Sequence, residues 1–280
     1  MIPLLLATFF SASFGLVVRY AQGRRCNLLA AGAINYATAA AFHLGRRALV
    51  AGFYPSQPTL ILGLIGGCAF VGAYFLLVPF MRLRGVSIAT AVLRLSVLMP
   101  ILVSVLWWGE RPGAVRSAGA ALAFISLPLL NFRVTGHGEH LGRRGAFLLV
   151  ALFVANGICM TVLSGYQQAG VQGETSLFLG ILFGTAAIIA LIGWLLHRGG
   201  SSRRDLVPGI MLGLCNALGN LSLVTALRQL PSVLVFPFHS AVGLVYVAVF
   251  ARVVWAERIS RYEAVGMFIT LVAVVLINLG

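Results

Sequence analysis

The chain has 280 residues, of which 60% are hydrophobic and only 9% are charged, and its mean hydropathy is +1.00. A soluble protein of this size carries about a quarter charged residues, so this composition excludes a soluble globular fold. The formal net charge of +14 comes from arginines that stand one to three at a time beside apolar runs. They form no basic cluster interleaved with aromatic residues, so nucleic acid is not an expected partner.

Apolar runs of about 17–25 residues, enough to cross roughly 30 Å of hydrocarbon as helix, follow one another along the chain. Ten are present, at residues 2–18, 28–44, 59–80, 86–108, 114–131, 146–166, 175–196, 206–228, 231–255 and 262–279. The first run lacks a basic segment before it, so it is expected to be a span and not a signal peptide. The sequence predicts an all-α polytopic membrane protein of ten transmembrane helices, in which Pro79, Pro100 and Pro237 can break their spans.

One Trp-x-Glu-Arg motif, at the corner between two apolar runs, occurs twice in the sequence. Trp108, Glu110 and Arg111 after the fourth run recur 147 residues later as Trp255, Glu257 and Arg258 after the ninth. The same shift places Gly66 on Gly213, Cys68 on Cys215, Gly72 on Gly219 and Asn131 on Asn278. The match predicts a first five-helix repeat at 1–134, a linker at 135–144 and a second repeat at 145–280. Because each repeat has an odd number of spans, the copies should be inverted, an arrangement typical of secondary transporters.

With ten runs in two halves and a Gly-Glu-Arg or Ala-Glu-Arg corner after spans four and nine, the chain resembles the drug/metabolite transporter superfamily, specifically the EamA-like exporters. The resemblance implies alternating access about a central cavity lined by spans 1, 3, 4, 6, 8 and 9. It also implies a small-molecule substrate and a functional monomer, since one chain supplies both halves of the cavity. Substrates in that family range from amino acids to sugars and drugs, so the resemblance does not select one.

Arg94 lies deep in the fourth predicted span, about 12 Å from its start at 1.5 Å per residue. An arginine at the bilayer centre costs roughly 2.5–3.5 kcal/mol and should therefore face a cavity or a partner. Its planar fork suits a carboxylate or a phosphate, so Arg94 is predicted to bind an anionic group of the substrate. The alternative is that Arg94 caps backbone carbonyls and locks helices together.

His239 lies at the matching depth of the ninth span, approached from the opposite side. Because histidine titrates near pH 6.5, His239 is the candidate for coupling transport to protons. A hydrogen-bonded structural histidine is the alternative.

The other substrate-binding candidates are hydroxyls and amides. Thr90 shares a helical stripe with Arg94, and Asn216 and Asn220 share one face of the eighth span. Tyr74, Asn156 and Tyr246 complete the set. Polar residues in membrane helices often only join helices, so each asparagine can serve the cavity or a helix contact.

All six acidic residues fall in loops or at span ends, so the chain lacks the buried carboxylate with which small multidrug pumps exchange cations for protons. The four cysteines show no metal-binding or disulfide spacing. No catalytic dyad or phosphate-binding loop stands at membrane depth, so neither an enzyme nor a bound metal or cofactor is expected.

The predicted function is secondary active transport, as an exporter, of a small polar or amphipathic metabolite with a carboxylate or phosphate. The alternative is a translocator (flippase) of a lipid or lipid-linked sugar, which would need a lateral opening between spans. Fourteen arginines flank the odd-numbered connections and five flank the even-numbered ones. The positive-inside rule then places both termini outside an inner membrane, whereas relatives are usually described with cytoplasmic termini.

Overall fold

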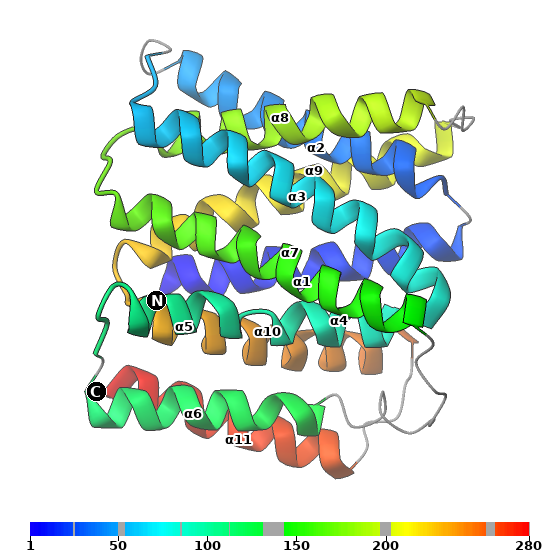
Figure 1. The fold of residues 1–280 in the computed structure, drawn as a ribbon. Helices are drawn as coiled ribbons and strands as arrows, with labels where there is room; N and C mark the ends of the chain where they lie inside the picture. The colour runs from blue at the N-terminus through cyan, green and yellow to red at the C-terminus, as the bar shows by residue number, and fades with distance from the viewer. Residues whose placement is uncertain are drawn as a thin grey trace.

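The computed structural model describes residues 1–24, 26–49, 54–84, 86–111, 113–130, 143–196, 203–255 and 261–279. Its elements in these ranges are all α-helices (Figure 1). They are α1 (Ile2–Gly23), α2 (Leu28–Ala48), α3 (Gln57–Arg84), α4 (Val86–Leu95), α5 (Leu98–Leu106), α6 (Ala114–Leu130), α7 (Arg143–Gln168), α8 (Thr175–Leu196), α9 (Arg203–Leu227), α10 (Ser232–Trp255) and α11 (Arg261–Leu279).

Seven of the described helices are long and apolar enough to cross a membrane: α1, α2, α3, α7, α8, α9 and α10. Shorter apolar stretches lie at Val92–Leu106, Ser117–Ser126 and Ala264–Leu276. The chain is thus a multi-pass helical membrane protein, while the count of ten spans stays a prediction. The second Trp-Glu-Arg corner has its Glu and Arg outside the described residues.

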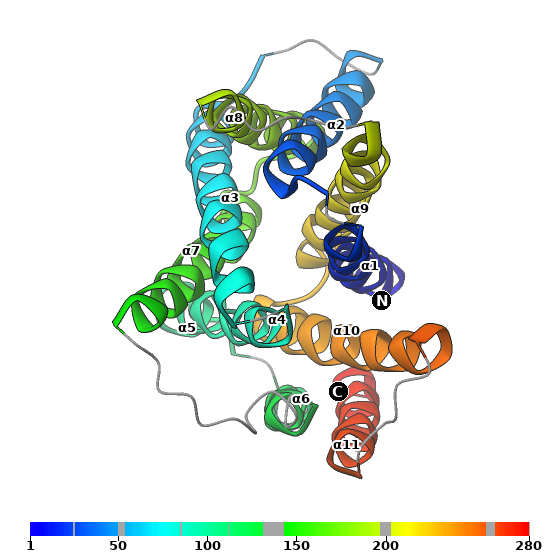
Figure 2. The same ribbon diagram turned by 90° about the vertical axis from the view of Figure 1, so that its right-hand side faces the viewer.

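The helices form one bundle with α2 and α8 at one edge and the pair α6 and α11 at the other (Figures 1 and 2). Helix α1 packs on α9 and α10, and α7 packs on α3, α4 and α5. Helix α2 contacts α8 and α9, while α3 contacts α7 and α8. Both chain termini lie at the same end of the bundle (Figure 1).

The fourth predicted span is divided into α4 and α5 by a turn at Ser96 and Val97. Pro100 has no N–H to donate back to the turn, so the regular hydrogen-bond ladder cannot continue through it. The carbonyl of Ser96, four residues before Pro100, accepts from Met99 N at 3.1 Å instead. The carbonyl of Leu93, near the end of α4, accepts from Ser96 Oγ at 2.7 Å and from Asn156 Nδ2 at 3.2 Å. The prediction of a break at Pro100 is confirmed, whereas Pro79 and Pro237 lie inside continuous helices.

In both halves, a glycine of one helix allows close contact with an isoleucine of its neighbour. A Cβ added to Gly63 of α3 would lie 2.8 Å from Ile181 Cγ2 on α8, and one added to Gly209 of α9 would lie 2.7 Å from Ile34 Cγ2 on α2. The isoleucines are 147 residues apart, but the glycines are 146 apart. The uniform shift of 147 is therefore wrong by one residue in α3 and α9. One residue is about 100° on a helix, so Cys68 and Cys215 are not equivalent: Cys68 is exposed and Cys215 lines a cavity.

At each end of the bundle a loop joins the N-terminus of a helix from the other half. Asn27 N donates to Asp205 Oδ1 at 2.9 Å at one end. At the other, Glu174 Oε2 accepts from Ser56 N at 3.0 Å and from Ser56 Oγ at 2.9 Å. Burial raises the pKa of Glu174, but hydrogen bonds from Thr59 and Ser56 outweigh burial and hold that pKa below its ordinary value.

Candidate functional site

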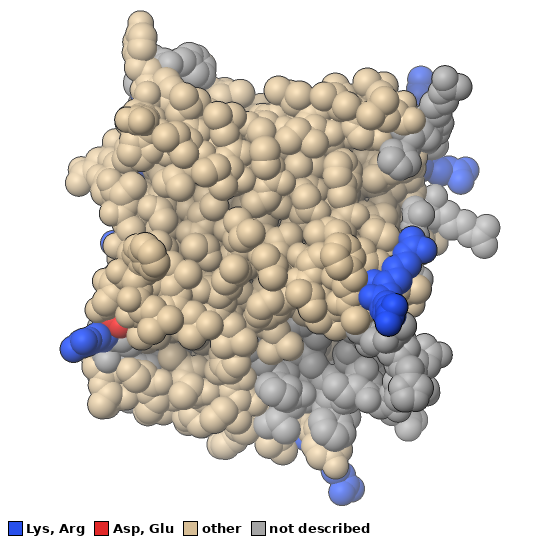
Figure 3. Space-filling view, viewed as in Figure 1, with Lys and Arg blue, Asp and Glu red and all other residues tan. Residues whose placement is uncertain are grey.

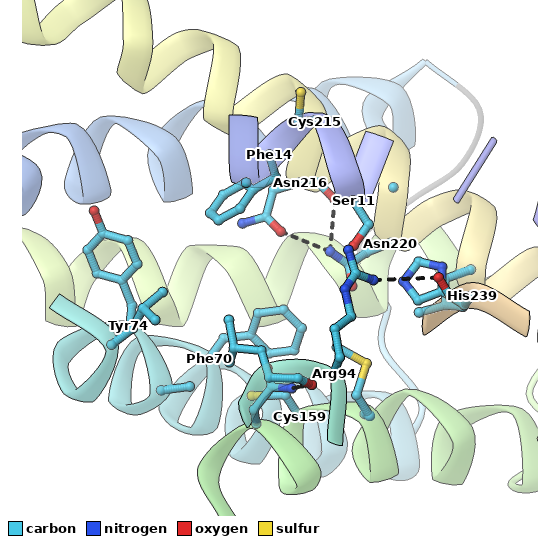
Figure 4. A pocket seen from close by; sticks show the side chains of 18 of the residues that line it. Ser11, Phe14, Phe70, Tyr74, Arg94, Cys159, Cys215, Asn216, Asn220 and His239 are labelled. Carbon is cyan, nitrogen blue, oxygen red and sulfur yellow. Dashed lines mark hydrogen bonds between the residues drawn. The ribbon is translucent and has the colours of Figure 1, made fainter. Parts of the chain in front are cut away.

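A cavity of about 180 Å³ lies at the middle of the bundle, between helices of both halves (Figure 4). Its lining combines aromatic, amide, hydroxyl, thiol and cationic side chains. They are Ser11, Phe14, Gly15, Tyr36, Phe70, Ala73, Tyr74, Leu77, Leu93, Arg94, Val97, Asn156, Cys159, Met160, Cys215, Asn216, Gly219, Asn220, Leu223, His239 and Ser240. None of these side chains is acidic. In the described part of the chain, no three His, Cys, Asp or Glu residues gather as a metal-binding group.

The two halves line this cavity with pairs of residues at constant spacing. Helices α1 and α7 contribute pairs whose members are 145 residues apart in the sequence: Ser11 and Asn156, Phe14 and Cys159, and Gly15 and Met160. Helices α3 and α9 contribute pairs whose members are 146 residues apart: Phe70 and Asn216, Ala73 and Gly219, Tyr74 and Asn220, and Leu77 and Leu223. Leu93 and Arg94 of α4 pair in the same way with His239 and Ser240 of α10. The α3 wall is therefore aromatic where the α9 wall presents amides, so the cavity has chemically different sides.

Arg94 reaches from α4 across the cavity towards Asn220 and His239 (Figure 4). Its Nη1 donates to the backbone oxygen of His239 at 3.5 Å, the outer limit for a hydrogen bond. A Cβ added to Gly243 of α10 would lie 2.9 Å from Nη1, so this glycine leaves room for the guanidinium. One long contact satisfies little of a five-donor group, which leaves Arg94 with N–H groups for a ligand.

His239 is 4% exposed, and its Nδ1 lies 3.2 Å from Thr8 Oγ1. The Thr8 hydroxyl donates its one proton to the Leu4 carbonyl at 2.8 Å, so towards His239 it can only accept. This contact favours the neutral tautomer in which Nδ1 carries the proton and Nε2 is the acceptor. This arrangement gives His239 a fixed orientation and one nitrogen available for a proton or a ligand.

Three asparagines form a chain of amides between α9 and α2. Asn220 Nδ2 donates to Asn216 Oδ1 at 3.0 Å and to its backbone oxygen at 2.9 Å. Asn216 Nδ2 donates in turn to Asn35 Oδ1 at 3.2 Å. Both predicted roles therefore apply to Asn216 and Asn220: their hydrogen-bonded chain joins α9 to α2, and both residues line the cavity. The chain orients the Asn220 side chain so that its Oδ1, which accepts none of these bonds, can accept from a ligand.

Two further predicted residues line the cavity, but the Tyr74 hydroxyl and the Asn156 Nδ2 donate to other groups of the protein. The Tyr74 hydroxyl donates to the backbone oxygen of Leu28, leaving its ring as the lining surface. Asn156 Nδ2 donates to Leu93 O and to Ser96 Oγ, and so satisfies the break between α4 and α5.

Tyr246 lies outside this cavity lining. Its hydroxyl is 3.5 Å from Ser13 Oγ, and its ring packs edge-on against Phe9 with centroids 5.3 Å apart. The side chain of Thr90 is outside the described residues. Sequence reasoning also missed part of the lining, namely Ser11, Phe14, Tyr36, Phe70, Cys159, Cys215 and Ser240. In a helix that is apolar on every face, such residues carry no signal that separates a cavity wall from the core.

Comparison with known proteins identifies the kind of molecule to which this cavity belongs. Residues 143–279 match the profile of the EamA-like transporter family. This match places the second half of the chain in the drug/metabolite transporter superfamily. Over nearly its whole length the chain is also similar to an uncharacterized protein of Haemophilus influenzae, 24% identical over 283 residues that cover 97% of this chain and 95% of that protein. A crystal structure of a further protein shares the fold, with a TM-score of 0.76 over 99% of this chain and 96% of that chain at 15% identity.

Proposed function

We propose that this chain is a secondary active transporter that exports a small polar or amphipathic metabolite bearing a carboxylate or phosphate, by alternating access about the central cavity. The observation that carries the proposal is Arg94, a cation with one long hydrogen bond to the protein, in a cavity between the two halves. A membrane-embedded arginine is costly, and binding an anion through two parallel hydrogen bonds is the use for which its geometry is best suited.

The proposed architecture is ten spans in two inverted repeats, residues 1–134 and 145–280. The paired cavity positions support it, and so do the contacts between helices, which correspond under exchange of the halves. Helix α1 on α9 corresponds to α7 on α3, and α2 on α9 corresponds to α8 on α3. Secondary transporters built in this way bind substrate near the midplane, where the repeats meet.

The proposed substrate carries a hydrogen-bond donor as well as the anionic group. Asn220 Oδ1 and His239 Nε2 are acceptors facing the same cavity as the Arg94 N–H groups, so a hydroxyl or amino group could bind them. Phe14 and Phe70 offer apolar surface for the remaining part of an amphipathic molecule (Figure 4). Through its free Nε2, His239 is the proposed proton-coupling residue.

The alternative, a lipid or lipid-linked sugar translocator, has less support. It needs a cavity that opens sideways into the bilayer. A second, apolar groove between α2 and α8 faces lipid, but it shares no lining residue with the central cavity. The cation and amides that line the central cavity favour a water-soluble metabolite as the transported molecule.

For topology, we propose that the end of the bundle opposite the termini is cytoplasmic in an inner membrane. Most of the arginines seen in Figure 3 lie at that end. Basic residues concentrate on the cytoplasmic side of membrane proteins. A fluorescent protein fused to the C-terminus should then be dark if it must fold in the cytoplasm, and a bright fusion would overturn this orientation.

A thermal-stability screen of the purified protein tests the proposed function. The compounds are amino acids, other carboxylates, sugar phosphates, neutral sugars and cationic dyes. A ligand at 100 times its Kd stabilises by about 2.7 kcal/mol, which such a screen detects. We expect a carboxylate or phosphate to raise the Tm of the wild type and not that of Arg94→Gln. Stabilisation by neutral or cationic compounds alone, equal in both proteins, would exclude an anionic substrate.

A further inference from the structure

The second groove, of about 280 Å³, lies between α2 and α8 and is lined almost entirely by apolar atoms. It is lined by Ala30, Ala33, Ile34, Ala37, Ala187, Ile188, Leu191 and Trp194. Alanines on α2 make the hollow, because they leave unfilled the space that larger side chains would occupy. Ile188 is 62% exposed and Leu191 45% exposed, so the groove opens on the outer surface of two candidate spans. In a membrane this surface is in contact with acyl chains.

The helix pair α2 and α8 has this groove at one end only. At its other end, the corresponding position is filled by a side chain. Shifted by 147 residues, Ala33 corresponds to Gly180 of α8 and Leu191 to Leu44 of α2. A Cβ added to Gly180 would lie 2.6 Å from Leu44 Cδ2, so Leu44 packs directly on that glycine. The Cβ of Ala33 prevents the same close approach of Leu191. The hollow therefore belongs to one end of the bundle.

That end is the arginine-rich one. Cys26, four residues before Ala30, has its Sγ 3.5 Å from the backbone oxygen of Arg204. Arg203 and Arg204 are exposed at the start of α9, and Arg24 is exposed at the end of α1. The one acidic side chain described at this site, Asp205, is 2% exposed and accepts from Asn27 N. The mouth of the groove thus presents positive charge to the headgroup region.

We propose that this groove binds one acyl chain of an anionic phospholipid, whose headgroup phosphate lies against Arg203 and Arg204. The groove follows the helix axis from Ala30 to Ala37, about 10 Å at 1.5 Å per residue, in the direction in which an acyl chain runs from its headgroup. Trp194 lies beside the mouth, at the level where tryptophan meets the membrane interface. Basic pockets beside transmembrane helices on the cytoplasmic side are suited to anionic headgroups. The proposal does not depend on the substrate of the central cavity.

Native mass spectrometry of the purified chain, with phosphatidylglycerol or phosphatidylcholine added back after delipidation, tests this site. Wild type should retain one phosphatidylglycerol in preference to phosphatidylcholine. Ala37→Trp fills the groove and should lose that lipid, whereas Ala264→Trp on α11, at the opposite edge of the bundle, should keep it. Arg203→Gln with Arg204→Gln should weaken phosphatidylglycerol binding about 30-fold and leave phosphatidylcholine unchanged.

Three results would overturn the proposal. The first is equal retention of both lipids by wild type, and the second is full retention by Ala37→Trp. The third is a wild-type dimer that Ala37→Trp separates, because the groove would then be covered by a second copy. Circular dichroism and size-exclusion profiles identify a misfolded variant, and the arginine variant supplies the decision if Ala37→Trp fails to fold.

Discussion

Replacing Arg94 by glutamine should have opposite effects on stability and on transport. An arginine at the bilayer centre costs roughly 3 kcal/mol, and a charged hydrogen bond as long as that to His239 O contributes about 1.5 kcal/mol, the low end of the range for such bonds. The uncharged variant should therefore be more stable by about 1.5 kcal/mol, a rise in Tm of roughly 3–6 °C. Loss of the charged partner should weaken binding of an anion by about 2–4 kcal/mol, or roughly 30- to 1,000-fold.

The assays are thermal denaturation in detergent and substrate flux in proteoliposomes at equal protein. Arg94→Lys keeps the charge and loses the planar fork, so it should retain the wild-type Tm with reduced transport. Arg143→Gln, an exposed site at the start of α7, controls for removing a positive charge. If Arg94→Gln lowers the Tm, Arg94 is a clip between helices; if flux is unchanged, it does not bind the substrate.

Three further variants test other parts of the structure. Glu110 Oε2 accepts from Val233 N at 3.1 Å, so Glu110→Ala removes a cap from α10 and should cost about 1 kcal/mol, whereas an unchanged Tm would show that this contact is not maintained. The folded-state pKa of Glu174 is lowered, so its stabilisation is present above the unfolded pKa and is lost as pH falls through the folded one. The Tm difference between wild type and Glu174→Gln should therefore shrink on acidification, and a constant difference from pH 7 to pH 3 would contradict this. His239→Gln should transport without the pH dependence of wild type, and full retention of that dependence would exclude His239 as the coupling residue.

Hydropathy and span length predicted most of the helices, because each apolar run had to satisfy its backbone hydrogen bonds internally. The fourth span was less predictable. Pro100 alone indicates only a site where a break is tolerated. The turn at Ser96 is stabilised by Asn156 of α7, a contact between residues far apart in sequence. The two-residue turn therefore depends on tertiary structure.

The ionisable lining residues could be predicted because a charge inside a membrane is costly, so such a residue is expected to face a cavity or a partner. Arg94 and His239 are accordingly placed together in the cavity. Tyr246 was placed by helical spacing alone, and the packing of α1 against α10 turns it towards Phe9 instead. The one-residue difference between the shift in α2 and α8 and the shift in α3 and α9 could not be read from sequence, because glycines and alanines match in either register. This one-residue difference determines which cysteine faces the cavity: Cys215 lines it, whereas Cys68 does not.

Cys215 allows the most direct test of the claim that the central cavity binds an organic anion. In a protein with serine at Cys26, Cys68 and Cys159, the rate of maleimide labelling of Cys215 is measured with carboxylates, sugar phosphates, neutral sugars and cationic dyes. A carboxylate or phosphate should slow labelling, and Arg94→Gln should abolish that protection. Labelling at one rate with every compound, or protection by neutral or cationic compounds that survives in Arg94→Gln, would contradict the assignment of this cavity as an anion-binding substrate site.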